Sequence, residues 1–283
     1  MTTTAVASSG GGRPTTGRRQ KRRSNKGAAT RPLLGLAGIV IVLLIWEAIS
    51  RLGIINPEFF PPASEVLVVF VQNLALTEFW IAVGQTMTSW ALGLAIATIA
   101  ALTLGLIIGA NTFLRKATHS TIEFLRPIPS VALIPLAVLL FGVDRGSALM
   151  LIIYASFWQV LIQVLYGVAD VDTVANDTAK SYGLGALARV RHVVWPTTLP
   201  YFMTGVRLAA AVALILAITA ELIINTPGLG YEIALAQSGA AVASMYALIL
   251  ATGLIGVIIN FAMRLIERKT LAWHSSIRGE AIV

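Results

Sequence analysis

"GSALMLIIYASFWQVLIQVLYGV" at residues 146–168 is one of two apolar stretches that decide the fold class of this chain. The other is "GVRLAAAVALILAITAELII" at residues 205–224. Each is long enough to cross a bilayer as a helix, which takes about 20 apolar residues. The sequence between them, "NDTAKSYGLGALARVRHVVWPTTLP" at residues 176–200, holds small residues, cations and prolines instead. The chain therefore keeps a helix-prone segment out of the membrane between two helices that cross it.

Apolar windows of similar length recur along the chain, at 33–49, 82–110, 119–141, 147–167, 201–224 and 245–266. They are continuous, whereas the strands of a membrane barrel alternate apolar and polar residues. A chain with 57% hydrophobic and only 12% charged residues also exceeds what a soluble domain buries. These features predict an all-α integral membrane protein of about six transmembrane helices, with a short cytoplasmic helix between the fourth and the fifth.

The positions of Lys and Arg predict the orientation of these helices. Arg115 with Lys116, and Lys180 with Arg189, lie in loops on one predicted side of the membrane, whereas residues 225–244 contain no Lys or Arg. Loops on the cytoplasmic side are enriched in Lys and Arg. The pattern predicts a multi-pass protein of the cell membrane with both termini in the cytoplasm.

The two ends of the chain differ in composition from the rest. Residues 1–32 hold eight of the 21 Lys and Arg among Gly, Ser, Thr and Ala, which predicts a disordered basic cytoplasmic tail. Residues 33–270 form the predicted transmembrane domain, with the cytoplasmic loop at 170–200, and residues 271–283 form a second cytoplasmic tail. Because no aromatic residue lies between the charges of the first tail, we expect it to attract anionic membrane lipid and not nucleic acid.

Residues that carry enzymatic or metal chemistry do not stand out. The chain has no Cys, and its three histidines, His119, His192 and His274, are far apart, so no metal site is indicated. The stretch "TAKS" at residues 178–181 lacks the upstream glycines of a phosphate-binding loop. We therefore expect no catalytic residues and no cofactor bound by this chain.

Glu221 is the most unusual ionisable residue, because it lies about 20 residues into its apolar window, in the outer third of the bilayer. A carboxyl group at such a depth must face protein or water. Two interpretations stay open: Glu221 lines a translocation path, or it serves a structural role between helices or at the membrane interface.

The first predicted outer loop contains "INPEFFPPASEVLVVFVQNL" at residues 55–74. Pro61 and Pro62 end the extended chain, Ser64 can cap a helix, and apolar residues then recur at helical spacing. An amphipathic helix near the outer surface is predicted, and a packed connector is favoured over a substrate site.

Residues 176–190 have the features of a helix that packs against a soluble partner. Small or short side chains recur every three or four residues, at Ala179, Gly183, Ala186 and Val190. Pro196 and Pro200 are expected to interrupt the helix before the chain enters the membrane. From these residues alone, a plain cytoplasmic linker is an equal alternative.

The same segment resembles the EAA loop of permeases of binding-protein-dependent ABC importers. The pattern of that loop runs Glu-Ala-Ala, three residues, Gly, nine residues and Ile-x-Leu-Pro. Here it reads Asp177-Thr178-Ala179, KSY, Gly183, LGALARVRH and Val193-Val194-Trp195-Pro196. The spacing is kept throughout, with Asp for Glu, Thr for Ala, Val for Ile and Trp for Leu.

Other stretches are similar to the nitrate, sulfonate and taurine branch of these importers. They are "FFPPASEV" at 59–66, "LRPIPSVALIPLAVLLFGV" at 125–143, "HVVWPTTLPYFMTGVRLA" at 192–209 and "AELIINTPGLGYEI" at 220–233. Together they cover most of the chain after the basic tail.

The resemblance implies a pore formed by two copies of the permease, two ATPase subunits that use ATP and Mg²⁺ on the cytoplasmic face, and an extracytoplasmic solute-binding protein. It implies that the cytoplasmic segment is the coupling helix that docks on the ATPase. The residues that it assigns to coupling are Asp177, Thr178, Ala179, Gly183, Gly185 and Pro196. The implied substrate is a small anion such as a sulfonate, taurine or nitrate, moved by alternating access.

Two other functions compete with this one. A self-contained secondary transporter or channel would need internal repeats, broken helices or buried ionisable relays. The sequence has no clear repeat and essentially one candidate carboxyl group. If the protein were a membrane-bound scaffold, the match of its loop to the importer spacing would be a coincidence. Copurification with an ATPase separates the importer from both alternatives.

Overall fold

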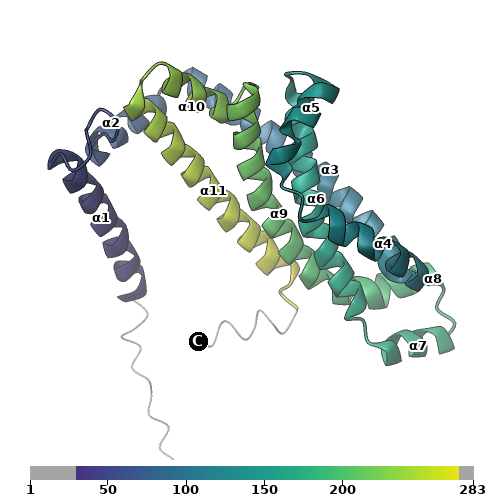
Figure 1. The fold of residues 1–283 in the computed structure, drawn as a ribbon. Helices are drawn as coiled ribbons and strands as arrows, with labels where there is room; N and C mark the ends of the chain where they lie inside the picture. The colour runs from purple at the N-terminus through teal and green to yellow at the C-terminus, as the bar shows by residue number, and fades with distance from the viewer. Residues whose placement is uncertain (1–29, 274–283) are drawn as a thin grey trace, which may run out of the picture. The chain divides into compact units, whose positions relative to one another are not determined.

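The computed structural model describes residues 30–273, and all its regular elements are helices (Figure 1). They are α1 (Thr30–Arg51), α2 (Ala63–Asn73), α3 (Thr77–Ala110), α4 (Thr112–Leu125), α5 (Ile134–Phe141), α6 (Arg145–Ala169), α7 (Thr173–Ser181), α8 (Ala186–Arg189), α9 (Trp195–Ile224), α10 (Leu229–Ser238) and α11 (Val242–Thr270). The chain forms two compact units, residues 1–46 and residues 47–283. Almost all of the two predicted tails lies outside the described residues.

Four continuous helical stretches in the described part of the chain are long and apolar enough to cross a membrane. They are α3, α6, α11 and the stretch Ala186–Ile224, which ends with α9. A fifth candidate consists of α4, a 3-10 turn at Ser130–Leu133 and α5, with a bend of 84°. The predicted all-α membrane class is confirmed. The single helix predicted at 119–141 is wrong, because Pro127 and Pro129 have no N–H to continue it.

Helices α3 and α6 pack closely because α3 carries a small residue every fourth position. The series is Gly93, Ala97, Ala101, Gly105 and Gly109. A Cβ added at Gly105 would lie 2.7 Å from Cγ1 of Val164, and one at Gly109 would lie 2.7 Å from Cγ1 of Val168. Small residues of this kind let two membrane helices approach until their backbones nearly touch. The branched side chains of α6 thus fill the positions that the glycines leave open.

The contact between α6 and α9 follows the same principle, and these two helices form the centre of the larger unit. A Cβ at Gly167 of α6 would lie 2.9 Å from Cα of Thr198, and one at Gly205 of α9 would lie 3.1 Å from Cα of Val160. Five alanines of α9 are fully buried: Ala209, Ala210, Ala213, Ala217 and Ala220. The indole nitrogen of Trp90 on α3 donates to the carbonyl oxygen of Ala210 at 2.9 Å, which fixes α3 to this pair.

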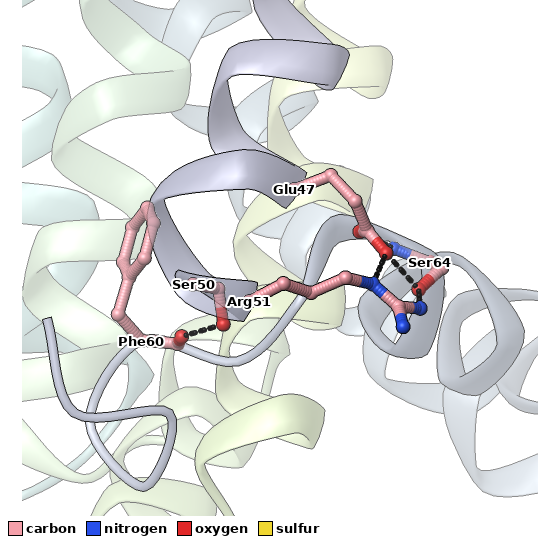
Figure 2. Close-up of polar contacts among 5 residues, drawn as sticks. All are labelled: Glu47, Ser50, Arg51, Phe60 and Ser64. Carbon is pink, nitrogen blue, oxygen red and sulfur yellow. Dashed lines mark hydrogen bonds and ion pairs between the residues drawn. The ribbon is translucent and has the colours of Figure 1, made fainter. Parts of the chain in front are cut away.

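The predicted amphipathic helix after the two prolines is present as α2, but its N-terminus is not capped by its own Ser64 side chain. The backbone N–H and the hydroxyl of Ser64 instead donate to the two carboxylate oxygens of Glu47, at 2.9 and 2.8 Å (Figure 2). Arg51 donates to the same carboxylate at 2.5 Å, and the Ser50 hydroxyl donates to the carbonyl oxygen of Phe60 at 2.8 Å. The last turn of α1 therefore caps α2, as a carboxylate at a helix N-terminus does.

Candidate functional site

The segment between α6 and α9 contains α7 and α8, which lie at the end of this helix pair remote from α10 (Figure 1). Asp172 caps α7, because its side chain accepts a hydrogen bond from the N–H of Val174 at 2.8 Å. The helix ends at Ser181. Gly183 then has a φ of 74°, and the N–H of Leu184 returns to the carbonyl oxygen of Ala179 at 3.0 Å. This is a Schellman ending, which favours glycine because other residues are strained at positive φ.

The structure therefore corrects the prediction of one short helix within residues 176–190. Helix α7 begins earlier, at Thr173, and stops at Ser181, and a separate turn of helix forms α8. A hydrogen bond of 3.4 Å from Arg189 to the side-chain oxygen of Asn176 links the two pieces. The sequence already indicated this break through Gly183, the glycine of the Schellman ending that follows α7.

The residues assigned to coupling do not share one face. Asp177, Thr178, Gly183 and Gly185 are exposed, Pro196 is half-buried, and Ala179 is buried with 8% exposure. Lys180 pairs with Asp177 at 2.8 Å on the outer side of α7. The predicted stripe of small residues is thus not a continuous outward surface, because Ala179 faces its own chain.

Sequence reasoning missed the large apolar side chains that this segment exposes. Val174, Tyr182 and Leu187 are 71%, 81% and 83% exposed. None of them lies on a long apolar helix, and clustered apolar side chains left open by a fold are typical of contact sites. The signal that could have indicated them is that each is a large apolar residue in a polar stretch.

The two prolines after α8 do not interrupt the chain as predicted. A π turn at Val190–Val194 leads directly into α9, where Pro196 occupies the first turn and Pro200 lies inside the helix. The π turn is where the α-helical hydrogen-bond pattern changes, and Pro196, which has no N–H, lies just after it. The carbonyl oxygen of Pro200 accepts a hydrogen bond from the Thr204 hydroxyl at 3.0 Å. The helical path from Ala186 to Ile224 is therefore continuous.

Glu221 is 1% exposed and holds together three helices. Its Oε2 accepts hydrogen bonds from the Thr86 hydroxyl of α3 at 2.8 Å and from the N–H of Gly230 in α10 at 3.1 Å. Its Oε1 has no hydrogen-bond partner among the described residues. These contacts favour the structural alternative for Glu221, and a role in lining a path stays a prediction.

Two glycines let the turn between α9 and α10 close over this carboxyl group. A Cβ at Gly228, whose φ is 155°, would collide with the carboxyl group of Glu221. A Cβ at Gly230 would collide with the carbonyl oxygen of Ile218. The glycines of the stretch "TPGLG" therefore leave the space that the Glu221 side chain occupies. Sequence spacing alone did not reveal this relationship.

The described residues hold no group of three or more His, Cys, Asp or Glu side chains that could bind a metal ion. Their arrangement is one of packed helices, a polar turn segment with exposed apolar side chains, and a buried carboxyl group used for hydrogen bonding.

Comparison with protein families decides the identity. Residues 101–272 match the family described as "Binding-protein-dependent transport system inner membrane component". The chain belongs to this family. The matched region includes the segment between α6 and α9 as well as Glu221. The protein is thus a multi-pass inner membrane permease component of a binding-protein-dependent ABC transporter and not itself an enzyme, and the resemblance seen in its sequence is confirmed.

Permeases from three bacteria are similar to this permease over most of their length. The taurine transport system permease TauC of Escherichia coli K12 is 28% identical over 250 residues, which cover 87% of this chain and 91% of TauC. The putative aliphatic sulfonates permease SsuC of Bacillus subtilis 168 is 26% identical, with 87% and 89% covered. The bicarbonate permease CmpB of Synechococcus elongatus is 27% identical, with 84% and 89% covered.

The fold of the permease is also similar to a chain in solved structures of the MetNI methionine ABC transporter in inward-facing conformations. The TM-score is 0.55 at 18% identity, and the match covers 67% of this chain and 96% of the other. At this identity the likeness establishes the permease fold alone.

Proposed function

We propose that this permease moves a small anion into the cell by alternating access, in a complex with a second copy of itself, two ATPase subunits and an extracytoplasmic solute-binding protein. Taurine, sulfonates and bicarbonate, the solutes in the names of its relatives, all carry an anionic group. ATP and Mg²⁺ act in the ATPase subunits in this scheme, and the permease itself binds neither.

The observation that carries the proposal is the exposure of Tyr182 and Leu187 on a segment that keeps the spacing of a coupling loop. Two large apolar side chains that are more than four-fifths exposed in a polar segment need a partner surface. Asp177, Thr178, Gly183, Gly185 and Pro196 shape the segment around them. The hydrogen bonds at the end of α7 fix the turn that follows it, and the segment is joined directly to α6 and α9, to which it would transmit motion.

A cross-linking experiment tests this coupling role. The chain has no native Cys, so Leu187→Cys can be paired with a cysteine in the cleft of the ATPase without background. We expect a cross-link in the assembled importer whose yield changes with nucleotide state. Ala179→Cys is the matched control, because Ala179 is buried in its own chain and should react poorly. Failure of Leu187→Cys to reach any ATPase position would remove the proposed docking.

We further propose six membrane spans, with the 22-residue helix α1 as the sixth beside the five candidates described above. Both termini and the α7–α8 segment then lie in the cytoplasm. Gly239, exposed after α10, lies outside in this arrangement. An impermeant maleimide should label Gly239→Cys in intact cells and Lys116→Cys only after permeabilisation. The reverse pattern would invert the orientation.

The secondary-transporter alternative predicts a different energy source for solute uptake. Reconstituted permease with its ATPase and binding protein should accumulate solute only with hydrolysable ATP. A self-contained transporter would accumulate it with an ion gradient and no ATPase. Uptake by the permease alone in such vesicles would overturn the importer.

A further inference from the structure

A cavity of about 620 Å³ lies between α4, the end of α3 and the last turns of α6. Helix α4 contributes Arg115, Thr118, His119, Ile122 and Glu123 to its lining, and Arg126, which directly follows the helix, also lines it. These positions recur every three or four residues, so they form one face of the helix. The facing walls are mainly apolar, with Ile108 from α3 and Ile162 and Leu165 from α6, together with the exposed Tyr166.

The orientation of α4 is the one expected of a helix at the surface of a membrane bundle. Its polar face lines the cavity, while Phe113 and Phe124 on the other side are 76% and 72% exposed. Ionisable side chains within membrane helices face the protein interior or a water-filled space, and they mark solute pathways. The side chains of Arg115, His119, Glu123 and Arg126 are exposed, so the cavity is open to water.

The charges in this cavity are not balanced. The described residues include no ion-pair partner for Arg115 or Arg126, and Nδ1 of His119 lies 3.4 Å from Oε2 of Glu123. Glu123, the single carboxylate of the lining, is thus closer to His119 than to either arginine. Two guanidinium groups remain available, and their planar donors suit sulfonate, carboxylate and other oxyanions.

The two arginines cannot hold one small ion together, since eleven residues of helix separate them by about 16 Å along the axis. They define two successive positions, with Arg115 near the loop after α3 and Arg126 at the bend before Pro127. Two weak positions in series attract an anion and still release it, whereas one tight site would retain it.

We propose that this cavity is the cytoplasmic vestibule of the translocation path and that Arg115 and Arg126 bind small oxyanions there. The inference rests on the proposed import function and names the residues that the anion meets on its way out of the membrane. A phospholipid phosphate has the same chemistry, so the experiment separates the two sources.

Thr118 is half-buried in the cavity lining, and Thr118→Cys introduces a single thiol there. The assembled importer is placed in vesicles of neutral phosphatidylcholine and treated with a sulfonate-bearing or a trimethylammonium-bearing methanethiosulfonate. Both rates are divided by the rates with free mercaptoethanol. We expect the anionic reagent to be favoured by about tenfold, the lower end of the effect of a charged cleft.

Arg115→Gln and Arg126→Gln should each reduce this preference, and Arg126→Lys should keep most of it. Millimolar methanesulfonate should slow the reaction. Phe124→Cys, on the opposite face of α4, is the control and should show no preference for the anionic reagent.

An unreactive Thr118→Cys, or a preference that survives both glutamine substitutions, would overturn the proposal. It would also fall if phosphatidylglycerol in the vesicles blocked the thiol while methanesulfonate did not, because the site would then hold a lipid headgroup. These readouts need no ATP-driven uptake. The vestibule proposal can therefore be refuted while the Leu187→Cys cross-link still supports docking on the ATPase. Equally, docking can be refuted while the vestibule proposal is supported.

Discussion

The hydroxyl of Thr86 donates a hydrogen bond of 2.8 Å to Glu221 and accepts one of 2.9 Å from the N–H of Leu229. One side chain of α3 thus joins the buried carboxyl group of α9 to the first turn of α10. The Thr86 side chain is fully buried, so neither of its partners can turn to water instead.

Thr86→Val should therefore destabilise the permease by about 1–3 kcal/mol, the usual cost of a buried polar group that loses its partner. Thermal unfolding of the purified permease in mild detergent measures the loss. The control is Thr88→Val, because the exposed Thr88 hydroxyl bonds only to Gly84 within its own helix. Equal melting temperatures for the two variants would contradict the bridging role.

Glu221→Gln should leave assembly and most of the uptake intact, because the amide oxygen can still accept from Thr86 and Gly230. Solute uptake and copurification of the ATPase are measured side by side. If uptake disappeared while the complex assembled normally, the carboxyl group would act in the translocation path, as one interpretation of the sequence predicts.

Gly105→Ala should weaken the packing of α3 on α6, since the new Cβ would lie 2.7 Å from a methyl group of the stiff Val164 side chain. Overpacking of this kind costs about 1–3 kcal/mol. Gly84→Ala in the same helix is the control, because no atom lies within 4 Å of its added Cβ. The expected order of melting temperatures is Gly84→Ala at or above the wild type and Gly105→Ala below it.

Gly183→Ala should loosen the end of α7 by about 1 kcal/mol or more, because alanine is strained at a φ of 74°. Hydrogen exchange at the Leu184 amide, which bonds to Ala179, reports this loosening. Gly185→Ala should leave the exchange unchanged, since Gly185 has an ordinary φ of −64°. Similar exchange in both variants would show that the Schellman ending does not hold the segment.

Glu47→Ala should expose the amide of Ser64, because the carboxylate of Glu47 accepts the hydrogen bond from that amide at 2.9 Å. Faster hydrogen exchange at Ser64 is the expected result. Glu65→Ala serves as the control, because Glu65 lies in the same first turn of α2 without contacting the Ser64 amide. An unchanged Ser64 amide in Glu47→Ala would mean that water or another group caps α2 equally well.

The class of the protein and the location of its helices were predictable from the sequence, because hydropathy and motif spacing are local properties. Five of the six long apolar windows correspond to single helices, whereas 119–141 divides into α4 and α5. The spacing from Asp177 to Pro196, a property of the linear chain, is enough to indicate the permease family. Local rules failed at Ser64 and at Pro200. At Ser64 the carboxylate of Glu47 supplied the cap in place of the serine side chain, and at Pro200 the helix continued through the proline.

Only the tertiary structure decided which polar groups meet. Thr86 and Glu221 are 135 residues apart in sequence, and their contact depends on how α3 approaches α9. That approach depends in turn on glycines and alanines whose role is to leave space, which no hydropathy pattern records. The same holds for the polar face of α4, which lines a cavity with residues of α3 and α6 only in the fold. A sequence specifies each helix through near neighbours, whereas contacts such as the one between Thr86 and Glu221 arise where faces of different helices come together.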